Sequence, residues 1–432
     1  MGLLKFFQKN ITSSDTILNL EWIKILLVVF ILYIIRFYYK YFTRINPLNG
    51  PTPLPLIGNL HLFGLELSKD LKKLSRRYGS TFEIYLMTRR FIVVSDPKEV
   101  EKVFNNSPKN KFFNRPELGS SHEYNMNTGM VFNNNYPTWR YNRKLTSQVL
   151  LSPRILKEFV TTNQQNFDKS MKYWQINYGT KKEFVVNIVE WARAYTTDLS
   201  FKLSTGMPTY SSASYSKISL DDVKNEEKCP QYLIDISREF SDLTANMISI
   251  GLNLILAHKE VKEKMLEEIN QVFADNSKRP MTHEDYEKME YSQAVVKEFL
   301  RYHTIAPALI RQTTSENAEI SGYNWPAGTC AFIDVNGLQK NPDCWEDADQ
   351  FKPERFLECE VDKIGKYTYT PFGGGVRICP GRLMARITIA SVLINLLRNY
   401  DIEYYEKENQ LKFIDSFINV VTDFKVILKP KN

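Results

Sequence analysis

The eleven residues PFGGGVRICPG, from Pro371 to Gly381, place one cysteine and one arginine among four glycines. Three uses of Cys379 agree with this stretch alone: a residue in a tight turn, a redox-active or nucleophilic thiol, or a metal ligand. Deciding between them depends on the composition of the chain and on its other motifs.

The chain has the size and composition of a globular protein with a sizeable core. Its 432 residues are 43% hydrophobic and 24% charged, and 56 basic against 49 acidic residues give a formal charge of +7. This mild excess suits a membrane surface or an acidic protein partner. It is too diffuse for nucleic-acid binding, and the sequence has no basic stripe with interleaved aromatic residues.

The cysteines and histidines have no metal-ligand spacing elsewhere. The five cysteines are Cys229, Cys330, Cys344, Cys359 and Cys379. They are odd in number, widely spaced and without a C-x-x-C pair, which argues against a zinc ribbon and against a disulfide framework. The five histidines lack an H-E-x-x-H pattern and are interpreted as surface or packing residues. The main body is therefore expected in a reducing compartment.

The stretch WIKILLVVFILYII, Trp22 to Ile35, is nearly all apolar, with Lys24 as its one charge. Extended to residues 17–39, it is long enough to cross a bilayer, and basic residues follow at once. A buried core helix and a signal peptide are the alternatives, but no small-x-small cleavage site follows. We predict a transmembrane anchor over residues 17–39, a luminal segment over 1–16 and a cytosolic main body.

Four prolines within nine residues predict a stiff connector behind the anchor. We assign it to residues 40–58 and one large catalytic domain to residues 59–432. Two strands are predicted at residues 81–86 and 91–96, with Arg89 and Arg90 in the turn between them, and helices over residues 152–203, 240–258, 259–273 and 382–397. The Ser-rich stretch 210–227 is expected to form a loop.

Three further motifs precede the opening stretch in the last third of the chain. EFLR places Glu298 and Arg301 on one face of a helix, which by itself is typical of a solvated surface pair. GYNWPAGT indicates a strand, a turn and a second strand. FKPERF adds a second pair of glutamate and arginine.

Together these motifs resemble the cytochrome P-450 family, the haem-thiolate monooxygenases. The family's cysteine loop reads Phe-x-x-Gly-x-Arg-x-Cys-x-Gly, and its fixed places are filled here by Phe372, Gly375, Arg377, Cys379 and Gly381. The resemblance extends from about residue 17 to the end, and the anchor and hinge match the membrane-bound branch. It implies a mainly α fold with small β-sheets, in one large domain that follows a transmembrane helix.

The resemblance implies a haem b cofactor whose iron is bound by the thiolate of Cys379. Such a ligand donates electron density to the iron and favours cleavage of an O–O bond. Amides between the glycines and the positive end of the following helix would stabilise that thiolate. The family's other cofactor-binding positions, those near the haem propionates above all, are matched by Trp139, Arg143, Arg311, Phe372 and Arg377.

The resemblance also assigns Glu298, Arg301 and Arg355 to a buried ion-pair triad that fixes the core around the haem. A buried charge network needs all of its partners, so the loss of one should impair folding as well as activity.

The partners implied by the resemblance are an NADPH-cytochrome P-450 reductase, a lipophilic small-molecule substrate and the membrane of the endoplasmic reticulum, with no nucleic acid. Basic residues of one segment, Arg140, Arg143 and Lys144, would help to dock an acidic reductase. Residues 306–310 match the segment that lines the substrate pocket, and residues 113–132 match the variable roof loop.

The central helix departs from the family pattern, which is a small residue, Gly, any residue, an acid and Thr. Counting back from AHKEV, the equivalents are Glu239, Phe240, Ser241, Asp242 and Leu243. Asp242 keeps the acid and Thr244 lies next to the alcohol position, so these two are the candidate catalytic residues. Phe240 replaces the glycine and would crowd the oxygen site.

The interval between Trp139 and Asp242 is also several tens of residues shorter than the membrane-bound family usually has. Three functions therefore stay open. The first is a monooxygenase that inserts one oxygen atom from O2 into a lipophilic molecule with electrons from the reductase. The others are a hydroperoxide-using isomerase or peroxygenase of the same fold, and a catalytically impaired haem-binding protein from a truncated or degenerate gene.

Overall fold

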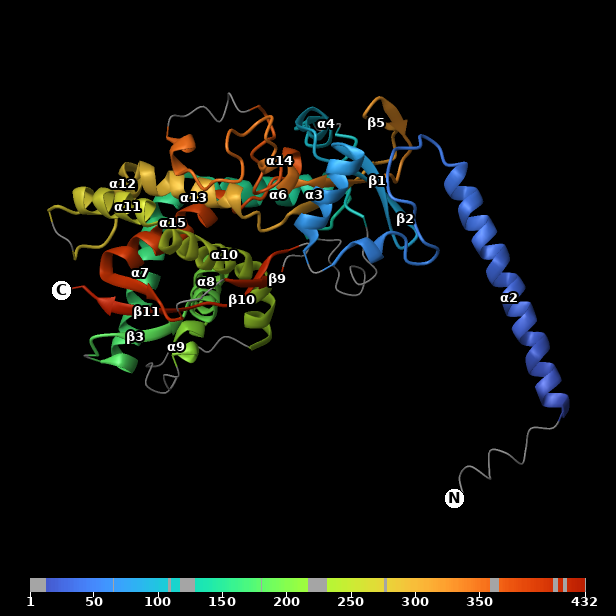
Figure 1. The fold of residues 1–432 in the computed structure, drawn as a ribbon. Helices are drawn as coiled ribbons and strands as arrows, with labels where there is room; N and C mark the ends of the chain where they lie inside the picture. The colour runs from blue at the N-terminus through green and yellow to red at the C-terminus, as the bar shows by residue number, and fades with distance from the viewer. Residues whose placement is uncertain are drawn as a thin grey trace, which may run out of the picture.

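The structure is a computed structural model that describes residues 13–64, 66–107, 110–116, 129–179, 181–216, 231–275, 278–357, 365–406, 411–414 and 418–431. A mainly helical body carries one long helix, α2 (Ser13–Phe42), which projects away from it (Figure 1). The prediction of a mainly α fold with small β-sheets is confirmed.

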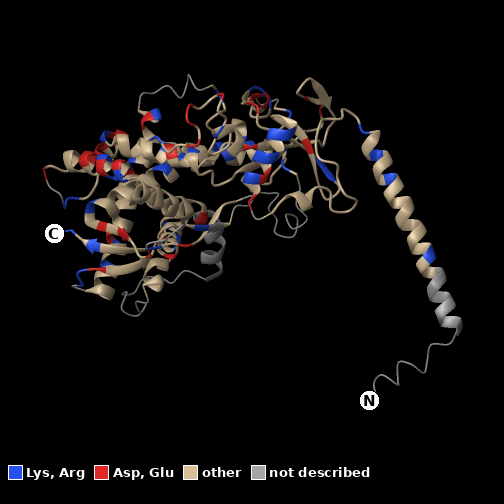
Figure 2. Ribbon diagram, viewed as in Figure 1, with Lys and Arg blue, Asp and Glu red and all other residues tan. Residues whose placement is uncertain are grey.

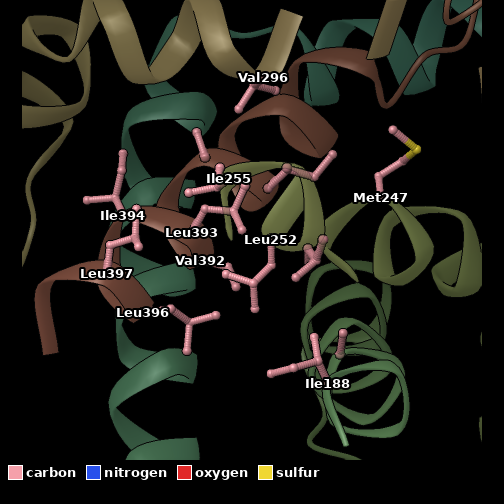
Figure 3. Packing of buried hydrophobic residues seen from close by; sticks show 14 of the residues in the cluster. Ile188, Met247, Leu252, Ile255, Val296, Val392, Leu393, Ile394, Leu396 and Leu397 are labelled. Carbon is pink, nitrogen blue, oxygen red and sulfur yellow. The ribbon is translucent and has the colours of Figure 1, made fainter. Parts of the chain in front are cut away.

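The core of the body is built around α15 (Arg382–Asn399). Every residue of this helix from Ile387 to Leu397 is buried, so α15 is covered on all sides rather than on one face. The long helices around it are α7 (Pro153–Tyr178), α8 (Ile188–Thr205), α10 (Gln231–Ala257) and α13 (Glu290–Tyr302). Figure 3 shows apolar side chains of α15, among them Leu393, beside Leu252 and Ile255 of α10.

A glycine sets the distance between three of these helices. A Cβ at Gly251 of α10 would lie 2.9 Å from the ring of Phe299 on α13 and 3.1 Å from the side chain of Leu393 on α15. Any larger residue would push these helices apart, because a packed interior leaves no free volume.

The remaining helices are short or peripheral. They are η1 (Leu60–Leu62), α3 (Leu67–Tyr78), α4 (Pro97–Val103), α6 (Tyr136–Leu150), α9 (Ser211–Tyr215), α11 (Lys259–Val272), α12 (His283–Lys288), α14 (Val335–Gln339), η3 (Pro353–Phe356) and η4 (Gly375–Arg377). Asp96 caps α4, because its side chain accepts a hydrogen bond of 2.8 Å from the amide of Lys98.

The largest sheet has the strand order β1-β2-β7-β4, with β2 and β7 parallel and the other pairs antiparallel. Its strands are β1 (Thr81–Leu86), β2 (Arg89–Val94), β4 (Ala308–Gln312) and β7 (Cys330–Asp334). All of β7 is buried, as expected for a strand between two neighbours. Three smaller sheets contain β3 (Phe184–Asn187), β5 (Ala318–Ile320), β6 (Tyr323–Trp325), β8 (Tyr400–Tyr404), β9 (Lys412–Ile414), β10 (Val420–Asp423) and β11 (Lys425–Pro430).

Two segments differ from the prediction. Arg89 and Arg90, expected in a turn, begin β2. Part of the expected loop 210–227 is the helix α9, and the rest of that loop from residue 217 on lies outside the described residues. A distant carboxylate explains α9: Asp198 of α8 accepts hydrogen bonds from the amides of Ser211 and Ser212 at 2.6 and 2.9 Å. No local pattern announces such a cap.

The helix α2 presents apolar side chains to its surroundings. Trp22 is 60% exposed and Leu26 is 65% exposed. From Trp22 to Phe42 the helix is long and apolar enough to cross a membrane, and none of its most apolar window is buried in the body. The limits drawn from the sequence at residues 17, 40 and 59 stay predictions.

The chain behind α2 is fastened to the main sheet by one buried carboxylate, Glu83 of β1. Arg44 donates to this carboxylate at 2.6 Å, and Arg90 of β2 donates to it at 2.9 Å. The two guanidiniums also donate to backbone carbonyls of the connector, including those of Leu48 and Ile45. The connector is therefore held by charge-assisted hydrogen bonds and is not a free linker.

The predicted triad of Glu298, Arg301 and Arg355 is confirmed. Arg301 donates to both oxygens of Glu298 at 2.8 Å with both side chains fully buried, and Arg355 donates to the same carboxylate at 3.2 Å. Arg301 also donates to the backbone carbonyls of Gln339 and Ala348 at 2.9 and 2.8 Å. The pair is thus a buried network and not the solvated pair that its spacing alone would indicate.

This network reaches the cysteine loop through Gln339. The Gln339 side chain accepts a hydrogen bond of 3.1 Å from the amide of Thr370, whose carbonyl in turn accepts one of 2.9 Å from Gly373. The triad therefore supports the segment that leads into Cys379.

We expect the replacement Glu298→Ala to lower the free energy of unfolding by about 3–5 kcal/mol, because it leaves the buried guanidinium of Arg301 without its carboxylate. The matched control is Glu158→Ala, which breaks the exposed pair with Arg154 and should cost less than about 1 kcal/mol. Urea titrations followed by circular dichroism measure both. Equal losses in the two variants would contradict the structural role of the triad.

Candidate functional site

The cysteine loop turns tightly between η4 and α15. The amide of Cys379 donates to the carbonyl of Phe372 at 3.0 Å and closes the loop. The helix α15 begins at Arg382, so its positive end lies just behind the cysteine, as predicted. Phe372 itself is half-buried and packs against the helical core.

The glycines before the cysteine make room for α4. A Cβ at Gly374 would lie 2.4 Å from the ring of Phe104, and one at Gly375 would lie 2.4 Å from the backbone oxygen of the same residue. Gly375 also has a φ of +67°, which side chains disfavour. The amide that reaches the Cys379 sulfur belongs to another glycine, Gly381.

The environment of Cys379 combines burial with positive charge. Burial raises the pKa of the Cys379 thiol, whereas the amide of Gly381 and the guanidiniums of Arg143, Arg382 and Arg115 act in the opposite direction; the pKa stays raised. A cation bound close to the sulfur, such as a metal ion, would stabilise its thiolate form.

Among the described residues, the sulfur of Cys379 has no cluster of companion ligands around it. In the described part of the chain, no group of three or more His, Cys, Asp or Glu side chains is arranged to hold a metal ion. Of the described cysteines, Cys330 is buried in the sheet and Cys344 lies in another cluster. A metal at Cys379 would thus take its other ligands from a cofactor.

Two arginines face each other beside the cysteine loop. Asn114 pairs with Gln312 in an antiparallel bridge, and the amide of Gln312 donates to the carbonyl of Asn114 at 2.7 Å. Arg115 follows Asn114 and Arg311 precedes Gln312, so the two arginines are opposite one another in this antiparallel pairing. Like charges in that position repel each other.

Arg311 is buried, whereas Arg115 is half-buried with its Nε shielded from solvent. Burial lowers the pKa of Arg311 well below its ordinary range, and the charges of Arg115 and Arg377 lower it further. Burial also lowers the pKa of Arg115, whose Nε has no hydrogen-bond partner. Among the described residues no carboxylate forms an ion pair with any of the three. A buried cationic cluster of this kind fits an anionic ligand.

Arg377, predicted as a propionate ligand, lies beside the cysteine loop, and its role toward a propionate stays a prediction. Its guanidinium donates to the carbonyls of Phe113, Met130 and Asn133 at 3.2, 3.0 and 2.5 Å. Its charge lies 3.9 Å from the ring centre of Phe113 and 4.7 Å from that of Trp139. Burial, with the charges of Arg115 and Arg143, lowers the pKa of Arg377 to about 9.

The predicted partners on α6 lie at this site as well. Trp139 is buried, and its indole N–H donates to the carbonyl of Met130 at 3.1 Å. Arg143, one turn further on, is half-buried, and burial lowers its pKa while the charge of Cys379 acts against that shift. Arg140 and Lys144 are exposed on the same helix. The roles given to these residues toward a cofactor stay predictions.

The candidate catalytic residues are on α10. The carboxylate of Asp242 lies 3.5 Å from the Nε of Arg193 on α8, with both side chains about one-third exposed. Leu243 and Thr244 follow and are half-buried. The side chains of Glu239, Phe240 and Ser241 lie outside the described residues, so the predicted crowding by Phe240 stays a prediction.

Sequence reasoning missed Arg115 and Arg193. Arg115 stands in the FFNRP segment, inside the expected roof loop, and its position opposite Arg311 follows from a pairing between residues far apart in the chain. Arg193 lies on a different helix from Asp242. The available signal for Arg115 in the sequence was its position close to the aromatic residues of the FFNRP segment. No sequence pattern pointed to Arg193.

Comparison with known proteins identifies relatives over most of the chain. The cytochrome P-450 family model matches residues 48–229 and 231–428. The chain is 25% identical to cytochrome P-450 71BT1 of Catharanthus roseus, over 85% of this chain and 88% of the relative. It is 27% identical to germacrene A acid 8-beta-hydroxylase of Inula hupehensis, over 82% and 85%.

A mammalian relative is similarly close. The chain is 25% identical to cytochrome P-450 2E1 of Mesocricetus auratus, over 90% of this chain and 92% of the relative. That alignment extends over 471 positions, more than the 432 residues of the chain, so the relative has segments without a counterpart here. The family match and these relatives together cover the anchor-proximal sheet, the helical core and the cysteine loop, and the chain belongs to the cytochrome P-450 family of monooxygenases.

Proposed function

We propose that this chain is a membrane-anchored haem-thiolate monooxygenase that inserts one oxygen atom from O2 into a lipophilic small molecule. The observation that carries the proposal is the half-buried sulfur of Cys379 beside a buried cluster of arginines that lacks a described carboxylate partner. A haem supplies both missing charges, since its iron is a cation and its two propionates are anions.

The residues of the site fit a haem. Cys379 would bind the iron, and Arg115 and Arg311 would hold a propionate, because the orphaned Nε of Arg115 needs an acceptor. Trp139, Arg143 and Phe372 would border the same cofactor. When bound, the haem supplies the activation of dioxygen for insertion into a C–H bond.

The protein's own groups tune the ligand. The amide of Gly381 and the guanidiniums of Arg143 and Arg382 would favour negative charge on the sulfur once an iron is bound, because they act against the effect of burial. Arg377 would act on the haem site indirectly, because its hydrogen bonds connect the segments around Phe113 and Asn133 to the cysteine loop.

The substrate would meet residues 306–310, which begin between α13 and β4 and continue within β4 up to the residue before Arg311. Their apolar content suits a lipophilic molecule. The curated relatives act on chemically different compounds by their printed names, so we assign a class of substrate and not a compound.

Electrons would come from an NADPH-dependent reductase. Arg140 and Lys144 are exposed on α6, near the cysteine side of the site, and suit an acidic partner. Figure 2 shows that the body otherwise carries acidic and basic residues interspersed, without one sign dominating.

The helix α2 would anchor the protein in the endoplasmic reticulum membrane with the body in the cytosol. Arg36, Lys40 and Arg44 at its end support this orientation by the positive-inside rule.

A second candidate is a hydroperoxide-using enzyme of the same fold. It is favoured by Leu243 at the alcohol position and by the ion pair between Asp242 and Arg193, which occupies the acid. Such an enzyme receives its oxygen already reduced and needs less proton delivery.

The carbon-monoxide difference spectrum of the reduced, purified chain tests the ligand. We expect a Soret band typical of thiolate ligation in the wild type and its loss in Cys379→Ser. Cys344→Ser, a cysteine in a different cluster, should keep the band. A band that survives in Cys379→Ser would overturn the assignment of the ligand.

Arg115→Leu should weaken the binding of haem but stabilise the haem-free protein. Losing a charged hydrogen bond, about 1.5–3 kcal/mol, should raise the Kd for haem about ten- to a hundredfold. Removal of a buried unpaired charge should raise the thermal midpoint of the haem-free protein. Haem transfer to apomyoglobin and thermal melts measure the two, with the exposed Arg154→Leu as control. Wild-type haem retention in Arg115→Leu would refute the propionate role.

The oxygen source separates the two candidate functions. We expect NADPH and reductase to support product formation from a panel of lipophilic compounds, and Asp242→Asn to slow it. Product formation with cumene hydroperoxide alone, unaffected by Asp242→Asn, would instead support the second candidate. A thiolate band without turnover under either condition would indicate a haem-binding protein.

A further inference from the structure

The helix α10 contains a buried amide amid an apolar face. Asn246 is fully buried, and its neighbours along the helix, Ala245, Met247 and Ile248, belong to the hydrophobic core. Burial of an amide without hydrogen-bond partners would cost free energy. The groups to which Asn246 is hydrogen-bonded therefore indicate which part of the chain it positions.

Asn246 binds the backbone at the start of β10. Its side-chain oxygen accepts a hydrogen bond of 3.2 Å from the amide of Val421, and its side-chain nitrogen donates to the carbonyl of Asn419 at 3.4 Å. The side-chain amide of Asn246 thus binds one N–H group and one carbonyl group of the backbone where β10 begins.

Asn419 passes this connection to the segment before β4. Its backbone amide donates to the carbonyl of Ile305 at 2.8 Å, and its side chain donates to the carbonyl of Thr304 at 2.7 Å. Three chain segments that are far apart in the sequence therefore meet at Asn246 and Asn419, which we call the asparagine clamp.

A second side chain holds the same strand. Arg193 of α8 donates to the carbonyl of Val421 at 3.1 Å while its Nε lies 3.5 Å from Asp242. Val421 is thereby held through its amide by Asn246 and through its carbonyl by Arg193. The clamp is thus tied to the acid of α10, one turn before Asn246.

The clamp borders the candidate site. Residues 304–305 lead directly into β4, where Leu309 and Arg311 lie 3.2 and 4.0 Å from the Cβ position of Gly373 in the cysteine loop. The position of residues 418–421 is therefore fixed relative to the segment that runs along the cysteine loop.

We infer that Asn246 is a positioning residue that sets the wall of the substrate pocket by holding residues 418–421 against residues 304–305, the start of the segment that continues into residues 306–310. The inference rests on the proposed function, in which residues 306–310 face the substrate. Asn246 acts through Asn419 and does not touch the reacting atoms.

The test compares Asn246→Leu with Asn395→Leu in the full-length, haem-loaded protein. Asn395 is the matched control, since it is a buried asparagine of α15 that donates to Gln164 and to the carbonyl of Ser391, both at 2.9 Å, away from the clamp. The probes are imidazole, which is small, and 4-phenylimidazole, which carries an additional phenyl ring; both are titrated by absorbance.

We expect Asn246→Leu to raise the Kd of 4-phenylimidazole about fivefold relative to that of imidazole. Asn395→Leu should leave this ratio unchanged. Hydrogen exchange of the amides of Asn419 and Val421 should quicken in Asn246→Leu alone. Asn419→Ala, which removes the side-chain hydrogen bond to Thr304, should change the ratio in the same direction and serves if Asn246→Leu does not fold.

An unchanged ratio with faster exchange would overturn the inference, because the clamp would then be structural only. Unchanged exchange in Asn246→Leu would also overturn it, since Asn246 would not hold the strand. If the wild type binds neither imidazole nor 4-phenylimidazole, the proposed haem function fails instead, and the exchange data still report on the clamp.

Discussion

The buried carboxylate of Glu298 is the constraint on which the rest of the body depends. It neutralises Arg301 in the interior, and Arg301 then orders the backbone around Gln339 and Ala348. Gln339 passes this order to Thr370 at the entrance of the cysteine loop. A buried charge pair thus helps to order, through hydrogen bonds of Arg301 and Gln339, the segment that leads into the cysteine loop.

Burial of charge also defines the site itself. Glu298 is matched by cations in the chain, whereas Arg115 and Arg311 have no described carboxylate beside them. The described part of the chain therefore has guanidinium charges without negative partners next to the half-buried sulfur of Cys379. That combination of a sulfur donor and buried guanidiniums is complementary to a planar metal complex with acidic side groups, and it explains why the cofactor and the fold would stabilise each other.

Local patterns predicted much of this architecture. The cysteine loop, the central helix α15 and the strands β1 and β2 follow from turn residues and periodicity close to their observed limits. What the sequence could not supply depends on contacts between distant segments. Arg115 meets Arg311 through the bridge of Asn114 with Gln312, and α9 exists because a carboxylate of α8 caps it. Arg377 had a family role, but which acceptors it reaches depends on where the roof segments lie.

The junction at Glu83 has a mechanical meaning. Arg44 and Arg90 bind this carboxylate directly behind α2. These hydrogen bonds restrain rotation of the connector, so a tilt of the helix would be transmitted to the main sheet. Helix tilt follows the thickness of a bilayer. With α2 embedded in a membrane, a change in bilayer thickness would therefore rotate the whole body. The lipid composition would then influence the angle between the site and the membrane surface.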